Sequence, residues 1–201
     1  MSLLIPDNNV LLQFVPNVLK SVQGETLLFD KNAPHLEVAE AWLTTTFLSE
    51  AVLTELPTRD ANNKLLHYAR MAVVAESMLH AVPQLDLVLT PNGFGVVSNT
   101  NIAPASKERV ERLLLSLEKM RDDTLAVLLP LLTQEVTWAT SDPCQYFMQT
   151  LYPWLDLPRK LGSTDHSWQR YQELHSKLIA IEERLAHDFF SCELLATLRQ
   201  A

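Results

Sequence analysis

Histidines are the residues in this chain best suited to metal binding, but their spacing does not form a metal site. None belongs to an HExxH pattern, and the chain has no CxxC pair. On a helix, the adjacent His187 and Asp188 project in different directions, and acidic pairs such as Glu182-Glu183 fit a solvated helix face. We therefore expect no metal ligands among the six histidines, which are His35, His67, His80, His166, His175 and His187.

Nucleophiles and phosphate-binding loops lack their usual sequence context. Gly93-Phe94-Gly95 has no third glycine and follows a turn, so it does not match a dinucleotide-binding loop. Serines such as Ser98, Ser106 and Ser141 stand outside any GxSxG motif. We therefore expect no catalytic residues and no cofactor-binding residues, and the chain is not expected to be an enzyme.

The charge balance argues against nucleic acid as a partner. The chain has a net charge of −8 and a pI near 5.2, and its 16 basic residues are interleaved with acidic ones. An acidic surface repels the phosphate backbone. The N-terminus lacks a basic region and a long apolar segment, and no apolar run could span a bilayer. We expect a cytoplasmic or virion-associated protein without a signal peptide or transmembrane segment.

The cysteine count indicates that the fold does not depend on disulfides. Cys144 and Cys192 are too few for a disulfide framework. Both have apolar neighbours, which favours buried free thiols, with a single disulfide as the alternative.

Helical spacing of apolar residues dominates the chain, and glycine is rare, with only 4 residues. We predict a mainly α protein, a multi-helix bundle in one domain, residues 1–201. Pro34 is expected in the first turn of a helix, and Pro83 and Pro130 are expected to end helices. The predicted helices cover about 7–20, 34–56 with a break and cap at Ser49, 63–81, 106–130, 131–138, 143–152 and 167–200 with a break and cap at Ser191.

Residues 85–98 interrupt the helical pattern. Leucines alternate before Thr90-Pro91-Asn92-Gly93, which is a strong turn signal, and apolar residues follow it. The pattern predicts one β-hairpin with strands at about 85–90 and 94–98.

Two segments of the chain resemble each other. When residues 29–56 are aligned with 171–198, they share a helix, a break and a second helix. This suggests an internal duplication with halves at about 1–82 and 131–201, joined by the hairpin and helix of 83–130; the alternative is that two leucine-rich helices agree through their period alone. The identical pairs are Leu36/Leu178, Glu40/Glu182, Leu43/Leu185, Phe47/Phe189, Ser49/Ser191, Leu53/Leu195 and Leu56/Leu198.

Several segments together resemble a known group of proteins. LTPNGFGVVSN, APAS and RVERL, preceded by LLQFVPNV and HLEVAEAWLTTTFLSEAVLTEL, are similar to uncharacterised proteins encoded in Bacteroidetes genomes and prophages. The resemblance implies a helical phage structural protein, such as a head–tail connector or completion protein, and it assigns no catalytic residue.

We therefore expect a non-enzymatic assembly protein whose partners are copies of itself or phage structural proteins. The hairpin tip, Pro91 to Phe94, and the aromatic Trp154 are the expected partner contacts. Aromatic residues concentrate between 138 and 171, and the pattern fits either a packed core or an exposed patch. The alternative function is a small-molecule-binding or enzymatic helical domain with an aromatic-lined pocket in 138–171. The expected contact residues are Pro91, Asn92, Gly93, Phe94 and Trp154.

Overall fold

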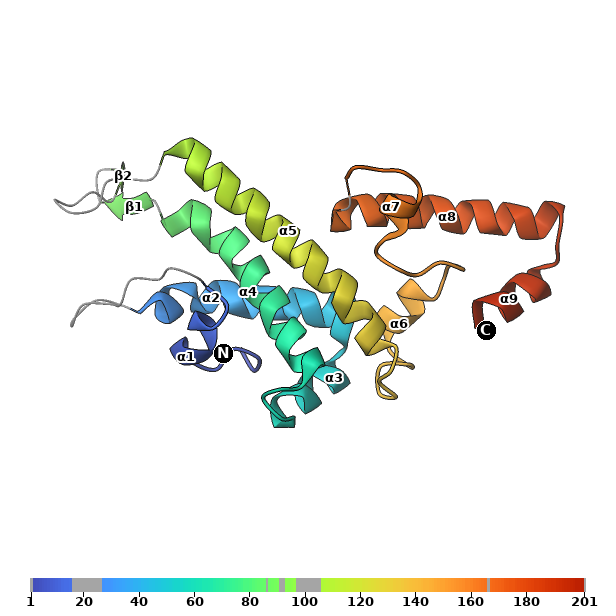
Figure 1. Ribbon diagram of the computed structural model, residues 1–201, viewed down its shortest axis with the longest axis horizontal. Coiled ribbons are helices and arrows are strands. Elements are labelled where there is room, and N and C mark those ends of the chain that lie inside the picture. The colour runs from blue at the N-terminus through green and yellow to red at the C-terminus, as the bar shows by residue number, and fades with distance from the viewer. Residues whose placement is uncertain are drawn as a thin grey trace. The chain divides into compact units, whose positions relative to one another are not determined.

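A computed structural model describes residues 2–15, 27–85, 87–90, 93–96, 106–165 and 167–200. It confirms the predicted mainly α class (Figure 1). Within these residues, no helix is long and apolar enough to cross a membrane. The chain divides into two compact units: Met1–Leu43 with Arg59–Arg121, and Thr44–Thr58 with Asp122–Ala201. We call them unit 1 and unit 2.

Unit 1 is built around the packing of two helices, α2 and α4, against each other (Figure 1). α4 is apolar or small on nearly all sides, and 11 of its 22 residues are buried, as expected for a central helix. The buried Asn32 on α2 donates a hydrogen bond to Ser77 on α4 at 3.0 Å. The helices of unit 1 are α1 (Asn8–Leu12), α2 (Leu28–Leu43), α4 (Lys64–Leu85) and the first part of α5 (Lys107–Leu132).

A buried carboxylate fixes the N-terminal segment to unit 1. The Glu40 Oε2 atom accepts hydrogen bonds from the Ser2 hydroxyl and the Leu4 N–H, each at 2.7 Å. Its Oε1 atom accepts one from the Leu3 N–H at 2.9 Å. On the other side of this segment, Arg70 Nε donates to the Leu4 carbonyl at 2.9 Å. Hydrogen bonds to a charged group are stronger than neutral ones. Glu40 therefore anchors residues 2–4, which lie outside any helix.

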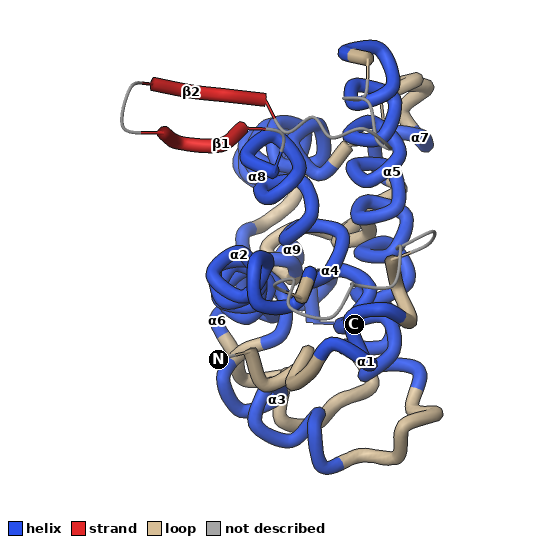
Figure 2. The backbone as a smooth tube through the Cα atoms, turned by 90° about the vertical axis from the view of Figure 1, so that its left-hand side faces the viewer, coloured by secondary structure: helices blue, strands red, loops and turns tan. Residues whose placement is uncertain are grey.

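Residues 87–96 contain two short strands. β1 (Leu87–Thr90) and β2 (Gly93–Val96) pair antiparallel, from Leu87 opposite Val96 to Thr90 opposite Gly93 (Figure 2). Leu85 belongs to α4, so the first strand begins later than the pattern of alternating leucines suggests.

Unit 2 follows a different plan, with one long helix and several short ones. Side-chain caps define most helix starts: the Ser141, Ser167 and Ser191 Oγ atoms each accept the N–H three residues later. The elements are a π-helical turn (Thr44–Leu48), α3 (Glu50–Glu55), a 3-10 turn (Leu56–Thr58), the α5 part from Asp122, α6 (Asp142–Phe147), α7 (Leu157–Lys160), α8 (Trp168–Asp188) and α9 (Cys192–Gln200).

Several predicted boundaries are wrong, chiefly at prolines. Pro34, Pro83 and Pro130 all lie inside helices instead of at their ends. α2 begins earlier, at Leu28, and Asn32 in this added part donates a hydrogen bond to Ser77 of α4. A proline near the last turn removes a single intrahelical bond, so α4 and α5 each continue for two more residues.

Three further expectations differ from the structure in unit 2. Residues 133–138 form no helix, α6 ends at Phe147 instead of near 152, and α7 lies between the predicted helices 143–152 and 167–200. The cysteines differ as well: both thiols are free, but neither is buried, since Cys144 is half-buried and Cys192 is exposed at the start of α9.

Candidate functional site

Several aromatic residues of unit 2, namely Phe47, Trp138, Phe147, Trp168 and Tyr171, form a packed core. Phe47 lies with its ring centroid 4.9 Å from that of Trp168 and 5.3 Å from that of Phe147. Trp138 is 1% exposed, and its indole N–H donates to the Phe47 carbonyl at 2.6 Å. Tyr171 is fully buried, and its hydroxyl donates to the Pro153 carbonyl at 2.7 Å. These side chains fill the interior and do not form an exposed patch.

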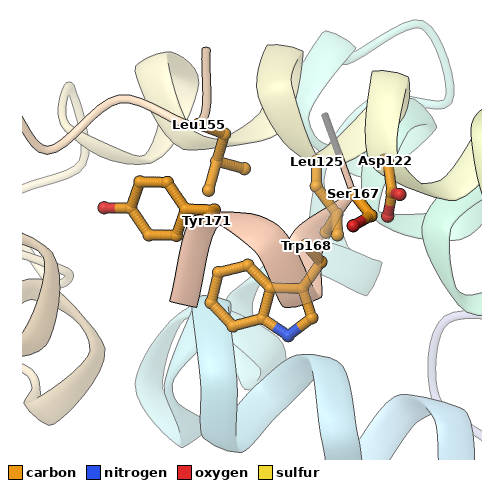
Figure 3. A pocket seen from close by; sticks show the side chains of 6 residues that line it. All are labelled: Asp122, Leu125, Leu155, Ser167, Trp168 and Tyr171. Carbon is orange, nitrogen blue, oxygen red and sulfur yellow. The ribbon is translucent and has the colours of Figure 1, made fainter. Parts of the chain in front are cut away.

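The space left within this core is too small for an organic ligand. Trp168 and Tyr171, on one turn of α8, line a small cavity together with Leu125 and Leu155 (Figure 3). The cavity between them has a volume of about 10 Å³. A cavity of this size holds at most one water molecule. An aromatic-lined ligand pocket is therefore not formed at this position.

His175 is a histidine enclosed by the aromatic core. It is 1% exposed, and its ring centroid lies 4.5 Å from that of Tyr146 and 5.4 Å from that of Tyr171. Its Nε2 atom has no hydrogen-bond partner in the described part of the chain. Burial lowers the pKa of His175, while hydrogen bonds to the backbone of Tyr146 and Phe147 and the charge of Glu182 oppose this shift.

We predict that replacing His175 with phenylalanine weakens the acid sensitivity of unit 2. The ordinary histidine pKa is 6.5, and the folded-state pKa of His175 is lower, so the unfolded state binds more protons. The stability associated with neutral His175 is present above pH 6.5 and is lost as the pH falls below it. Melting temperatures measured from about pH 7 to pH 5 are expected to fall less steeply for His175→Phe than for wild type. Identical slopes would count against this assignment; His187→Gln, at an exposed position, is the control.

A second hollow in unit 2 is large enough for a ligand. It is a groove of about 470 Å³ between the π-helical turn, the start of α3 and the residues before α6. Hydroxyl groups dominate its lining, and two carboxylates join them. Two of the hydroxyls already cap helices: Ser49 accepts the Val52 N–H, and Ser141 accepts the Cys144 N–H. The lining residues are Thr44, Thr45, Ser49, Glu50, Ala51, Thr137, Thr140, Ser141, Asp142 and Pro143.

The backbone beside this groove is strained at Ser49. Its φ of 83° and ψ of 156° lie in a region occupied almost only by glycine. The preceding π-helical turn is closed by the Ser49 N–H, which donates to the Thr44 carbonyl at 2.9 Å. Local strain of this type persists only where the surrounding packing enforces it, and here Phe47 and Leu48 are fully buried.

Ser49→Gly is therefore expected to stabilise the protein by about 1 kcal/mol, because release of the strain outweighs the loss of a weak cap. The Ser49 Oγ atom is 3.5 Å from the Val52 nitrogen, which is a long hydrogen bond. Ser191→Gly is the matched control: Ser191 caps α9 at 3.1 Å without a positive φ, so its loss is expected to destabilise slightly. Urea denaturation of both variants checks this, and destabilisation by Ser49→Gly would refute it.

The predicted partner contacts lie in different parts of the structure, and two of them are not among the described residues. Gly93 and Phe94 lie in β2, whereas Pro91 and Asn92 lie outside the described residues. Trp154 is half-buried in the segment between α6 and α7. The neighbouring Tyr152 donates a hydrogen bond to Asp156 at 2.7 Å, which raises the pKa of Tyr152 to about 12. Trp154 thus lies in a segment held by local bonds, with part of its ring accessible.

A group of exposed apolar residues in unit 2 was not among the predicted sites. It lies on α8, α9 and the residues between them, and we call it the arm face. Phe189 is 76% exposed and Phe190 is 60% exposed, and four aliphatic side chains nearby are each at least 41% exposed. Large apolar side chains that gather on an exposed surface are typical of interaction sites. The arm face consists of Ile181, Leu185, Phe189, Phe190, Leu194 and Leu198.

An ion pair between the two helices holds this surface together. The Glu182 side chain is 5% exposed, and its Oε2 atom accepts bonds from Arg199 Nε at 3.3 Å and Nη2 at 3.0 Å. Its Oε1 atom accepts the Leu151 N–H at 2.9 Å. α9 therefore turns back towards α8 (Figure 1). The apolar pattern of these helices could be identified from the sequence, but their exposure could not.

Comparisons with known proteins place the chain in a family without assigning it a role. Residues 15–148 match the family model described as "Family of unknown function (DUF6712)". A search of curated proteins and a search of solved structures found no match. The matched segment includes the two strands and α5, and α8 and α9 follow it. Since the match spans more than half of the chain, the protein belongs to DUF6712, a family of unknown function.

Proposed function

We propose that this protein is a non-enzymatic assembly protein of prophage origin that acts in virion head–tail assembly through protein–protein contacts. The arm face is the observation that carries this proposal. Two adjacent phenylalanines that are 76% and 60% exposed are unfavourable in water unless another protein covers them. The resemblance of the hairpin and helix segments to prophage-encoded proteins supplies the setting.

The cavity and the groove of unit 2 are weaker candidates for the functional site, because neither is well suited to bind a ligand. The cavity in the aromatic core has a volume of only about 10 Å³. In the larger groove, the Ser49 and Ser141 hydroxyls are engaged in capping α3 and α6. The structural role of these capping hydroxyls is sufficient to explain their presence.

The two-stranded sheet offers a second surface for contacts. Each strand pairs on one side only within the described residues, so each has an edge that can accept a strand from a partner. Gly93 and Phe94 of β2 remain proposed contact residues on this basis, and Trp154 remains one through its accessible ring.

Deleting the gene from a prophage that carries it tests the proposal. Electron microscopy of induced particles is expected to show heads and tails that are not joined, and wild-type protein supplied in trans is expected to restore complete particles. Phe189→Glu is expected not to restore them, whereas Leu161→Glu, at a 65% exposed position outside the arm face, is the control that does. Normal, infectious particles from the deletion strain would rule out the assembly role.

A further inference from the structure

We propose that protonation of His175 detaches the buried face of α8 from α6, so that acid releases the helix that carries much of the arm face. This inference rests on the proposed assembly role of the arm face and adds a condition that controls it. Two observations carry it: the position of His175 within the buried face of α8, and the lack of a partner for its Nε2 atom among the described residues.

The buried face of α8 is aromatic at its start and polar in its middle. Trp168 and Tyr171 pack against the rings of Phe47 and Phe147. The next two buried positions are polar, so the docking of α8 depends on them as well as on the aromatic core. The buried residues of α8 are Trp168, Tyr171, His175, Glu182 and Ala186, which helical periodicity places on one side of the helix.

The ring of His175 is enclosed where α8 meets α6. The Tyr146 ring of α6 lies 4.5 Å away, centroid to centroid, and the backbone of Tyr146 and Phe147 hydrogen-bonds to His175. Because Nε2 has no partner, the nitrogen that makes these bonds is Nδ1, and Nε2 is a buried acceptor without a donor. Leaving such an atom without a bond costs about 1–3 kcal/mol. An apolar ring at this position would avoid that cost and would hold α8 on α6 at any pH.

Acid acts on this contact because protonation adds an N–H group at Nε2. In the docked state this group is a buried charged donor, and Nε2 has no hydrogen-bond partner in the described part of unit 2. A buried charge without such a bond is unfavourable, whereas water solvates it once α8 leaves α6. The released state therefore binds the proton more tightly than the docked state, and acid shifts the equilibrium towards release.

The groups that face the ring compensate this charge only weakly. Tyr146 on α6 and Tyr171 on α8 flank it, and burial raises the pKa of both hydroxyls, so neither supplies a negative charge. The charge of Glu182 favours the protonated ring, but Glu182 lies two turns further along α8, roughly 10 Å along the helix axis. Burial has the largest effect and lowers the pKa of His175, so release sets in below the ordinary histidine pKa of 6.5.

Glu182 connects this contact to the segment before α7 and to α9. Its Oε1 atom accepts the Leu151 N–H at 2.9 Å, and its Oε2 atom binds Arg199 of α9. When α8 leaves α6, the bond between Glu182 and the Leu151 N–H opens as well. The Leu151 amide therefore reports the release of α8.

Amide hydrogen exchange of the full-length chain tests the inference, with each rate corrected for intrinsic exchange at the same pH. From about pH 7.5 to about pH 5.5, the protection of the Leu151 amide is expected to fall about five- to tenfold in wild type, because the released state takes up one more proton. In His175→Phe the same change is expected to stay below about twofold. Leu3 and Leu4, whose N–H groups bind the buried Glu40 in unit 1, are internal controls expected to keep their protection.

A titration of wild type keeps the test independent of that variant. The NMR signals of the His175 imidazole are expected to titrate below pH 6.5, over the same range in which Leu151 loses protection. His175→Gln provides a second side chain that does not titrate. Leu151 protection that does not change with pH in wild type, or that falls equally in wild type and both variants, would overturn the inference. Neither outcome bears on the assembly role, which fails only if particles form normally without the gene.

Discussion

Trp138→Ala is expected to lower the free energy of unfolding of unit 2 by about 3–5 kcal/mol. Trp138 is among the largest fully buried side chains, and its removal leaves a cavity beside Phe47. It also removes the indole N–H that donates to the Phe47 carbonyl at 2.6 Å, within the π-helical turn. Trp138→Phe keeps most of the volume but loses this donor, so we expect a smaller loss of about 1–2 kcal/mol.

Urea denaturation followed by far-ultraviolet circular dichroism measures both changes. Trp154→Ala is the matched control, since Trp154 is half-buried and lies outside the packed aromatic core. We expect it to keep the wild-type melting temperature while weakening assembly. Equal destabilisation by Trp138→Ala and Trp154→Ala would show that Trp154 is a core residue, and it would remove Trp154 from the proposed contacts.

Glu40→Gln is expected to destabilise unit 1 by about 2–3 kcal/mol. The Glu40 carboxylate accepts three bonds, from the Ser2 hydroxyl and from the N–H groups of Leu3 and Leu4. A glutamine side chain replaces one acceptor oxygen with an N–H₂ group, which then faces a donor. Because Glu40 is only 7% exposed, water does not replace the lost bonds.

Hydrogen exchange gives a local measurement of this effect. The Leu3 and Leu4 amides are expected to lose protection in Glu40→Gln, while the Leu151 amide, which is bonded to Glu182, keeps its protection. Glu118→Gln, on the exposed surface of α5, is the control for the charge change alone. Unchanged protection at Leu3 and Leu4 would show that Glu40 does not anchor the N-terminal segment.

Local signals in the sequence predicted the helices and their breaks well. Ser49 and Ser191 were identified as caps after a break, and both accept the N–H three residues later. Such caps depend on residues close together in the chain, so the sequence reveals them. Prolines were less reliable, because Pro34 lies inside α2, and this helix packs along α4, a segment far away in the sequence.

The burial of the candidate site residues was harder to predict, because the burial of a side chain depends on which segments pack against it. The aromatic residues of 138–171 fitted both a core and a patch, and packing among Phe47, Phe147 and Trp168 decided for the core. Phe47 comes from a segment far from the other two in the sequence, and no local pattern brings it there. The positive φ of Ser49 likewise gave no signal, since the sequence shows only a serine at a helix start.

The sequence by itself determined a mainly helical, acidic chain, the helix caps, and two similar helix-break-helix segments. Each of these follows from interactions within a few residues or from composition. Only the tertiary structure decided that the first segment is covered and that the second is open at Leu185 and Phe189. The physical reason is that the sequence of a helix shows which face is apolar and can be buried. Whether that face is buried depends on whether another helix packs against it. α4 does so for α2.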